Sequence, residues 1–226
     1  MTELWLIRHG ETEWSLAGRH TSRTDLPLTE RGRERAIALG KYLAGTKFAA
    51  VLRSPMLRAK ETCELAGFGD VAVVDDGLKE WDYGVYEGRT TTEIQAEIPG
   101  WNVWKDPIIG GETAEQVGVR ADGVIARALE LAAGGPTSQS RDVGHPAGSG
   151  QVVGHPSPVS DVGHPDEAVN VALFAHAHIL RILAARWVGL EARGGELFAL
   201  GTGSVSVLGW ERETRVILRW NRGFEG

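Results

Sequence analysis

The chain has 226 residues, of which 42% are hydrophobic and 24% are charged, and its 24 basic and 30 acidic residues give a formal net charge of −6. A net-acidic chain has no general attraction for nucleic acid or an anionic membrane, so neither is expected as a partner. An anionic substrate must therefore be drawn in by a local cluster of positive charge, and the absence of any run of 18 apolar residues predicts no membrane span.

Strands and helices are predicted to alternate along the first half of the chain. Three short apolar runs predict buried strands, at residues 4–7, 49–52 and 71–74. Between the first two, Thr29 can cap a helix that stops near Gly45. Ser54 followed by Pro55 predicts the start of the next helix, because serine caps helices and proline suits the first helical position.

The second half of the chain continues this alternation. Thr113 and Gln116 form the pattern of a capping box, and apolar residues at helical spacing follow as far as Leu131. A buried strand is predicted at 171–175, a helix at 178–188, and a closing hairpin at 205–210 and 216–220. The order predicts an α/β fold of three layers, with helices on both faces of a mostly parallel sheet.

Residues 136–168 interrupt this pattern, because they are rich in Gly, Pro, Ser, Asp and His and show no apolar periodicity. A surface insertion in a single domain spanning residues 1–226 is the simplest interpretation. The alternatives are a lid over a site and a metal site formed by His145, His155 and His164. No other feature of the sequence suggests a metal, and none is expected.

Basic residues follow three of the predicted strands. Arg8 and His9 come directly after the first strand, Arg58 follows the second, and His176 follows the strand at 171–175. If these strands are parallel neighbours, the four side chains converge at the carboxyl edge of the sheet, where ligands bind in such folds. A single histidine or arginine at such a position more often has a structural role, but the combination of four predicts an anion-binding site. A helix that starts at Ser54 would add free backbone N–H groups to this site.

Several separated motifs resemble one family. They are Leu6–Thr12, Gly18–Arg19, Asp25–Gly32, Ser54–Thr62, Leu78–Gly84 with Glu87–Gly88, Gly110–Glu112 and Phe174–Arg181. Their sequences and order resemble the histidine phosphatase superfamily, also called phosphoglycerate mutase-like. The resemblance covers essentially the whole chain outside residues 136–168, and it implies the fold of that superfamily.

The resemblance implies a role for each of five residues. His9 corresponds to a nucleophile, and Glu80 to a proton donor. Arg8, Arg58 and His176 correspond to groups that hold the phosphoryl group. A neutral imidazole nitrogen can attack phosphorus, and we expect its other nitrogen to donate a hydrogen bond to a backbone carbonyl.

Two positions depart from the common form of the family. Ser15 stands where asparagine is frequent, and it can still donate to a phosphate with shorter reach. Ala177 replaces a glycine whose N–H is expected to face the phosphate. The expected rim of the substrate pocket comprises Thr21, Ser22, Tyr83, Trp104 and His178, although the aromatic residues and His178 could equally serve in packing.

Within the superfamily, the segments at 80–88, 90–94, 99–104 and 175–178 resemble the sedoheptulose-bisphosphatase-like and acid phosphatase branch. This implies a metal-independent phosphatase that needs no cofactor and acts on small phosphate esters, sugar phosphates above all. A phosphoglycerate mutase and a phosphate-binding regulatory module are the alternatives. The single cysteine, Cys63, favours a reducing compartment, so we expect a cytoplasmic enzyme, and the sequence allows a homodimer.

Overall fold

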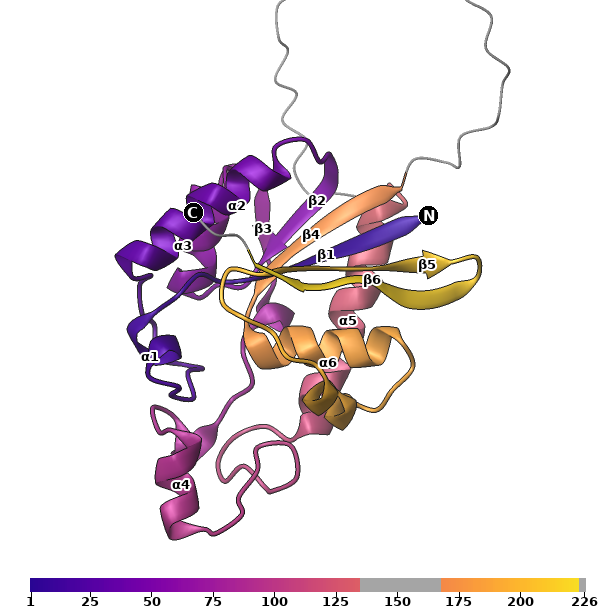
Figure 1. The fold of residues 1–226 in the computed structure, drawn as a ribbon. Coiled ribbons are helices and arrows are strands. Elements are labelled where there is room, and N and C mark those ends of the chain that lie inside the picture. Colours follow the sequence, from indigo (N-terminus) through magenta and orange to yellow (C-terminus); the bar gives the residue numbers. More distant parts are fainter. Residues whose placement is uncertain (135–167, 224–226) are drawn as a thin grey trace, which may run out of the picture.

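The computed structural model describes residues 1–134 and 168–223, which form a six-stranded sheet with helices packed against it (Figure 1). The strands are β1 (Thr2–Arg8), β2 (Phe48–Arg53), β3 (Ala72–Val74), β4 (Val169–Ala175), β5 (Val205–Glu211) and β6 (Thr214–Arg222), in the order β3-β2-β4-β1-β5-β6. The first four strands of this order run parallel, and β5 and β6 form an antiparallel hairpin beside β1. The predicted strands and the mostly parallel sheet are confirmed.

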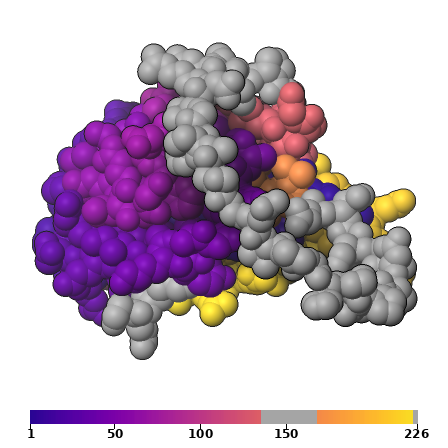
Figure 2. All heavy atoms as spheres, turned by 90° about the horizontal axis from the view of Figure 1, so that it is seen from above, coloured from indigo at the N-terminus to yellow at the C-terminus, as the bar shows by residue number. Residues whose placement is uncertain are grey.

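Helices cover both faces of the sheet, which confirms the three predicted layers (Figure 1). They are α1 (Glu13–Leu16), α2 (Glu30–Leu43), α3 (Leu57–Leu65), α4 (Thr91–Glu97), α5 (Ala114–Ala132) and α6 (Ala177–Trp187), with 3₁₀ turns η1 (Asp76–Leu78), η2 (Gly84–Tyr86) and η3 (Ala192–Leu197). Helices α2 and α3 pack on one face, and α5 and α6 on the other. In the space-filling view, the purple atoms that follow β1 in the chain form the left of the molecule, and yellow atoms of the C-terminal part lie at its right and lower side (Figure 2).

Strand β1 divides its side chains between two hydrophobic cores. Leu4 and Leu6 join the core under α5 and α6, whereas Trp5 and Ile7 join the core under α2 and α3. A strand covered on both faces must be apolar at every position, which explains its continuous apolar run. Burial of each such side chain stabilises the fold by roughly 1.5–3 kcal/mol, so the position of β1, and of the residues that follow it, is strongly fixed.

Helix starts follow the predicted caps in two of three cases. The Thr29 hydroxyl accepts from the Gly32 N–H at the start of α2, and Thr113 and Gln116 form the capping box of α5. The predicted helix start at Ser54 was wrong, because α3 begins at Leu57, whose N–H donates to the Asp25 carboxylate at 2.7 Å. The hydroxyl of Ser54 instead lies 2.8 Å from the His176 ring.

Three further observations concern predictions made from the sequence. The short helices α1 and α4 were not predicted, although Thr90 and Glu93 form a capping box at the start of α4. The predicted insertion at 136–168 lies outside the described residues except for Ala168, and so does the alternative metal site of His145, His155 and His164. Among the described helices, none combines the length and apolar character that a membrane span requires.

Helix α2 makes a close backbone contact with the residues that follow His9. A Cβ atom on Gly32 would lie 2.3 Å from the Glu11 carbonyl oxygen, and one on Gly10 would lie 2.7 Å from the Gly32 carbonyl oxygen. These distances are far below van der Waals contact, so only glycine allows the two segments to pack this closely. The contact holds the loop after β1 against the first turn of α2.

We expect Gly32→Ala to lower the free energy of unfolding by about 1–3 kcal/mol, because the methyl group must push α2 away from Glu11. Gly123→Ala is the matched control, since Gly123 lies inside α5 and a Cβ atom there would meet no neighbouring atom within 4 Å. That variant should gain up to about 1 kcal/mol from helix propensity. Urea unfolding followed by circular dichroism measures both, and equal stabilities would contradict the packing argument.

Candidate active site

His9 follows β1 directly and is held by its backbone on both sides. Its N–H donates to the Ala175 carbonyl at 2.9 Å, and its own carbonyl accepts from the Gly203 N–H at 2.9 Å. The ring is buried, with Nδ1 2.7 Å from the Gly10 carbonyl oxygen. Because a carbonyl only accepts, Nδ1 carries the hydrogen and Nε2 keeps its lone pair. The free nitrogen is the one that a nucleophile requires.

The parallel pairing of β1 with β4 brings His9 and His176 together. Arg8 is the register partner of Ala175, so the residues that follow each of them lie side by side, with ring centroids 5.1 Å apart. Arg8 donates through Nη1 to the Leu200 carbonyl. Its Nε is buried and has no hydrogen-bond partner among the described residues, so this guanidinium donor is available at this point.

Arg58 lies in the first turn of α3 and is fully buried. Its Nε donates to Nδ1 of His176 at 3.1 Å, its Nη1 to the carbonyl of Thr24 at 3.2 Å, and its Nη2 to the carbonyls of Thr21 and Ser22, each at 3.2 Å. These contacts fix the guanidinium group, so its charge is oriented before any ligand arrives. The structure thus brings Arg8, Arg58 and the two histidines into one cluster.

Glu80 joins this cluster through the start of α6. Its carboxylate accepts from the backbone N–H groups of His178 and Ile179, each at 3.0 Å, and from that of Trp81 at 2.9 Å. The helix has no capping side chain of its own at His176, so Glu80 takes over that function from a distant part of the chain. A carboxyl group held at the helix start that follows His176 can give or take a proton there.

The electrostatic environment keeps both histidines of the cluster uncharged. Burial lowers the pKa of His9 well below the ordinary value of 6.5, and the charges of Arg58 and Arg8 lower it further. The pKa of His176 is lowered in the same way, first by burial and then by Arg58. The charge available to hold an anion therefore comes from the two arginines.

Two of the aromatic residues expected at the rim of the substrate pocket contact His178. The Tyr83 hydroxyl is 2.7 Å from Nδ1 of His178, and Tyr83 is itself buried. Trp104 is also buried, with its ring between His178 and the guanidinium of Arg181, whose carbon lies 4.6 Å from the ring centroid. Both aromatic residues therefore support His178, whose side chain keeps 15% of its exposure.

Of the remaining predicted residues, Thr21 and Ser22 contact the cluster through their backbone. Thr21 and Ser22 provide the carbonyls that hold Arg58. The Ser15 hydroxyl is hydrogen-bonded to the backbone of Thr12 in the capping box of α1. Ala177 is the first residue of α6, directly after His176.

Sequence reasoning assigned no role to several residues that organise the site. The Thr62 hydroxyl accepts from the Gly10 N–H at 2.9 Å and donates to the Arg58 carbonyl at 2.7 Å, which connects α3 to the loop that follows His9. The carboxylate of Glu87 accepts from the N–H groups of Ser22 and Thr24. Both residues lie within the motifs, but Thr62 meets Gly10, and Glu87 meets Ser22 and Thr24, across separations of 52, 65 and 63 residues.

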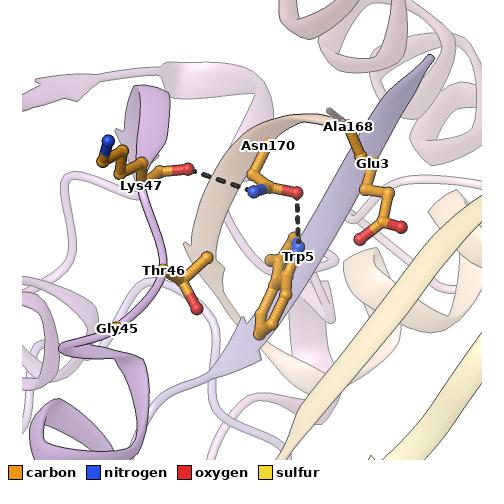
Figure 3. A pocket seen from close by; sticks show the side chains of 7 residues that line it. All are labelled: Glu3, Trp5, Gly45, Thr46, Lys47, Ala168 and Asn170. Carbon is orange, nitrogen blue, oxygen red and sulfur yellow. Dashed lines mark hydrogen bonds between the residues drawn. The ribbon is translucent and has the colours of Figure 1, made fainter. Parts of the chain in front are cut away.

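A separate hollow lies at the opposite end of the strands, where β1, β2 and β4 begin. It is lined by Glu3, Trp5, Gly45, Thr46, Lys47, Ala168 and Asn170 (Figure 3). The Asn170 side chain bridges the Trp5 indole and the Lys47 carbonyl, at 3.2 and 3.1 Å. None of these seven residues belongs to the cluster around His9, which lies at the carboxyl edge.

Known proteins resemble this chain over most of its length. Residues 4–137 and 160–223 match the family described as the histidine phosphatase superfamily (branch 1). An acid phosphatase of Mycobacterium tuberculosis is 36% identical over 214 residues, which are 94% of this chain and 88% of the relative. Sedoheptulose 1,7-bisphosphatase of Saccharomyces cerevisiae is 34% identical over 209 residues, which are 82% and 67% of the two chains.

The same likeness extends to solved structures. The structure of the open reading frame Rv3214 from Mycobacterium tuberculosis superposes with a TM-score of 0.78 and 32% sequence identity, over 98% of each chain. The residues of the cluster, Arg8, His9, Arg58, Glu80 and His176, all fall within the ranges that match the family.

The lowered histidine pKa values predict how stability depends on pH. The histidines of the unfolded chain bind protons near pH 6.5, whereas His9, His176 and His178 do not, because burial lowers their pKa values well below 6.5. The free energy of unfolding should therefore fall as the pH drops from 7.5 to 5.5, by up to about 1.4 kcal/mol per pH unit for each histidine. Urea unfolding across this range measures the slope, and a constant stability would contradict the neutral assignment.

Proposed function

The chain belongs to the histidine phosphatase superfamily, and on that premise we propose that it hydrolyses small phosphate monoesters, sugar phosphates above all, through a phosphorylated His9. The observation that carries the proposal is the buried cluster around His9. There an imidazole with a free Nε2 lies beside His176, with the guanidinium groups of Arg8 and Arg58 at the same edge of the sheet.

In the first step, Nε2 of His9 attacks phosphorus, a P–N bond forms and the ester P–O bond breaks. Glu80 gives its proton to the alcohol oxygen as the alcohol leaves. Arg8, Arg58 and His176 hold the phosphoryl oxygens, and the unpartnered Nε of Arg8 is a buried donor that a phosphoryl oxygen would satisfy. These interactions strengthen as negative charge spreads over the transferred group.

In the second step, the ionised carboxylate of Glu80 accepts a proton from water, and the water oxygen attacks phosphorus. The P–N bond breaks, inorganic phosphate leaves, and His9 regains its free Nε2. Neither step requires a metal or a cofactor, because the arginines supply the positive charge and Glu80 carries the proton.

The substrate class is supported by the names of the relatives and by the rim. One relative is a sedoheptulose 1,7-bisphosphatase and another an acid phosphatase. We propose that Thr21, Ser22 and His178, backed by Tyr83 and Trp104, line the substrate pocket. Ser15 and Ala177 complete the phosphate-binding loops of this proposal, next to α1 and at the start of α6.

The mutase alternative is disfavoured by the basic residues between Glu87 and Glu112. A substrate carboxylate needs free cations there, and the segment has only Arg89 and Lys105. Arg89 lies 2.7 Å from a carboxylate oxygen of Glu97, and Lys105 lies 3.8 Å from one of Glu196. Both cations are thus already paired.

The organisation of the protein completes the proposal. We propose one catalytic domain with an insertion near residues 136–168, which is supported by the omission of residues 138–159 from the family match. A cytoplasmic location is supported by the single buried cysteine, Cys63, and a small phosphorylated molecule is the expected partner.

A phosphate-release screen tests the function. Wild-type protein in the presence of EDTA should release inorganic phosphate from sugar phosphates, and His9→Ala should lose at least about 10³-fold of that rate. The panel should include phosphoglycerates with a bisphosphate primer and phosphopeptides. Loss of activity on chelation, or activity that survives in His9→Ala, would contradict the mechanism, and isomerisation without phosphate release would favour a mutase.

A second experiment tests the proton donor. With p-nitrophenyl phosphate, whose leaving group needs no proton, Glu80→Gln should retain a burst of nitrophenol while its steady turnover falls about 10²-fold. Glu93→Gln is the matched control, because Glu93 also accepts a backbone N–H at a helix start but lies on the exposed α4. The burst is measured by rapid quench and the turnover in the steady state. If Glu80→Gln and Glu93→Gln have the same burst and the same turnover rate, Glu80 does not have this role.

A further inference from the structure

His176 has a hydrogen-bond partner on each of its two ring nitrogens. Nδ1 is 3.1 Å from Nε of Arg58, and Nε2 is 2.8 Å from the hydroxyl oxygen of Ser54. All three residues are fully buried, so water does not compete for these contacts. The ring is therefore placed by two protein groups that come from α3 and from the segment after β2.

The nature of the two partners determines where the ring carries its hydrogen. A guanidinium group can only donate, so Nδ1 of His176 must accept and cannot be protonated. A neutral imidazole then has its single hydrogen on Nε2, which donates to Ser54. A doubly protonated ring would point a second N–H at the Arg58 N–H, so the arrangement excludes the charged form.

We propose that Ser54 is a positioning residue that, together with Arg58, holds His176 as the neutral tautomer with its hydrogen on Nε2. This inference rests on the proposed function, since it describes how one phosphoryl-holding residue is prepared. Without substrate the ring donates its single hydrogen to Ser54, and a phosphoryl oxygen replaces Ser54 as the acceptor of that hydrogen when it binds. His176 therefore contributes a directed hydrogen bond, and the positive charge comes from the arginines.

A helix-capping role for Ser54 is the structural alternative, and the geometry disfavours it. The Ser54 hydroxyl is 3.4 Å from the Met56 N–H, but 2.8 Å from the His176 ring. Helix α3 begins only at Leu57. The backbone of Ser54 is anchored separately, because its N–H donates to the Phe174 carbonyl at 2.9 Å, which fixes the hydroxyl beside β4.

The burial and charge around the ring agree with this assignment. Burial lowers the pKa of His176 well below 6.5, and the charges of Arg58 and Arg8 act in the same direction. The same argument applied to His9 gives the opposite tautomer, with the hydrogen on Nδ1 facing the Gly10 carbonyl. The two adjacent rings are thus held in complementary states, one with a free Nε2 and the other with Nε2–H.

Nitrogen-15 NMR of histidine-labelled protein without substrate tests the tautomer directly. At pH 7, the His176 signals, assigned by their absence in His176→Gln, should show a protonated Nε2 and an unprotonated Nδ1. A doubly protonated ring, or a hydrogen on Nδ1, would overturn the proposal. This measurement needs no turnover, so it is independent of whether the proposed phosphatase activity is found.

Kinetics of Ser54 variants test the positioning role. Ser54→Ala should lower kcat about tenfold, the effect of one directed hydrogen bond, and broaden the His176 Nε2–H signal by faster exchange. Ser54→Thr keeps the hydroxyl, so its kcat and its His176 Nε2–H signal should be close to those of the wild type. Ser206→Ala is the matched control, because Ser206 is equally buried but accepts from the Asn221 N–H, away from the site.

Two results would overturn the role of Ser54. One is a Ser54→Ala enzyme with unchanged kcat and an unchanged His176 spectrum. The other is an equal loss of kcat in Ser206→Ala, which would show that removal of any buried serine hydroxyl has this effect. If Ser54→Ala does not fold, the wild-type spectrum and the Ser54→Thr variant still decide the question.

Discussion

The parallel hydrogen bonding of β1 to β4 is the constraint on which the site depends. The register that pairs Arg8 with Ala175 places the two following histidines side by side. Helix α6 starts immediately after the second of them, and its free N–H groups bind the carboxylate of Glu80. One backbone ladder thus positions His9, the neighbouring imidazole of His176 and the carboxylate of Glu80 at the same end of the sheet.

Burial gives these groups their chemical character. Removed from water, the histidines stay neutral, and Arg58 is retained in the interior only because three carbonyls and the His176 ring accept from it. The segment that supplies those carbonyls is in turn fixed by Glu87. The positive charge is therefore in place before a substrate binds, which is the arrangement that favours a transition state richer in negative charge than the substrate.

The sequence predicted those features that depend on local pattern. Apolar runs located the buried strands, side-chain caps located α2 and α5, and basic residues at strand ends located Arg8, His9, Arg58 and His176. Contacts between distant segments could not be predicted in this way. The carboxylate of Glu80 accepts from the N–H of His178, 98 positions away. The Ser54 hydroxyl does not cap a helix but contacts the ring of His176, 122 positions away.

The alternation along β1 has a consequence for how the chain tolerates insertions and deletions. Leu4 and Leu6 face one core, and Trp5 and Ile7 face the other. Loss of a single residue in this strand would either turn the side chains before the deletion toward the wrong core or turn those after it, His9 included, to the other face of the sheet. A shift of one position in this strand would therefore damage stability and catalysis together.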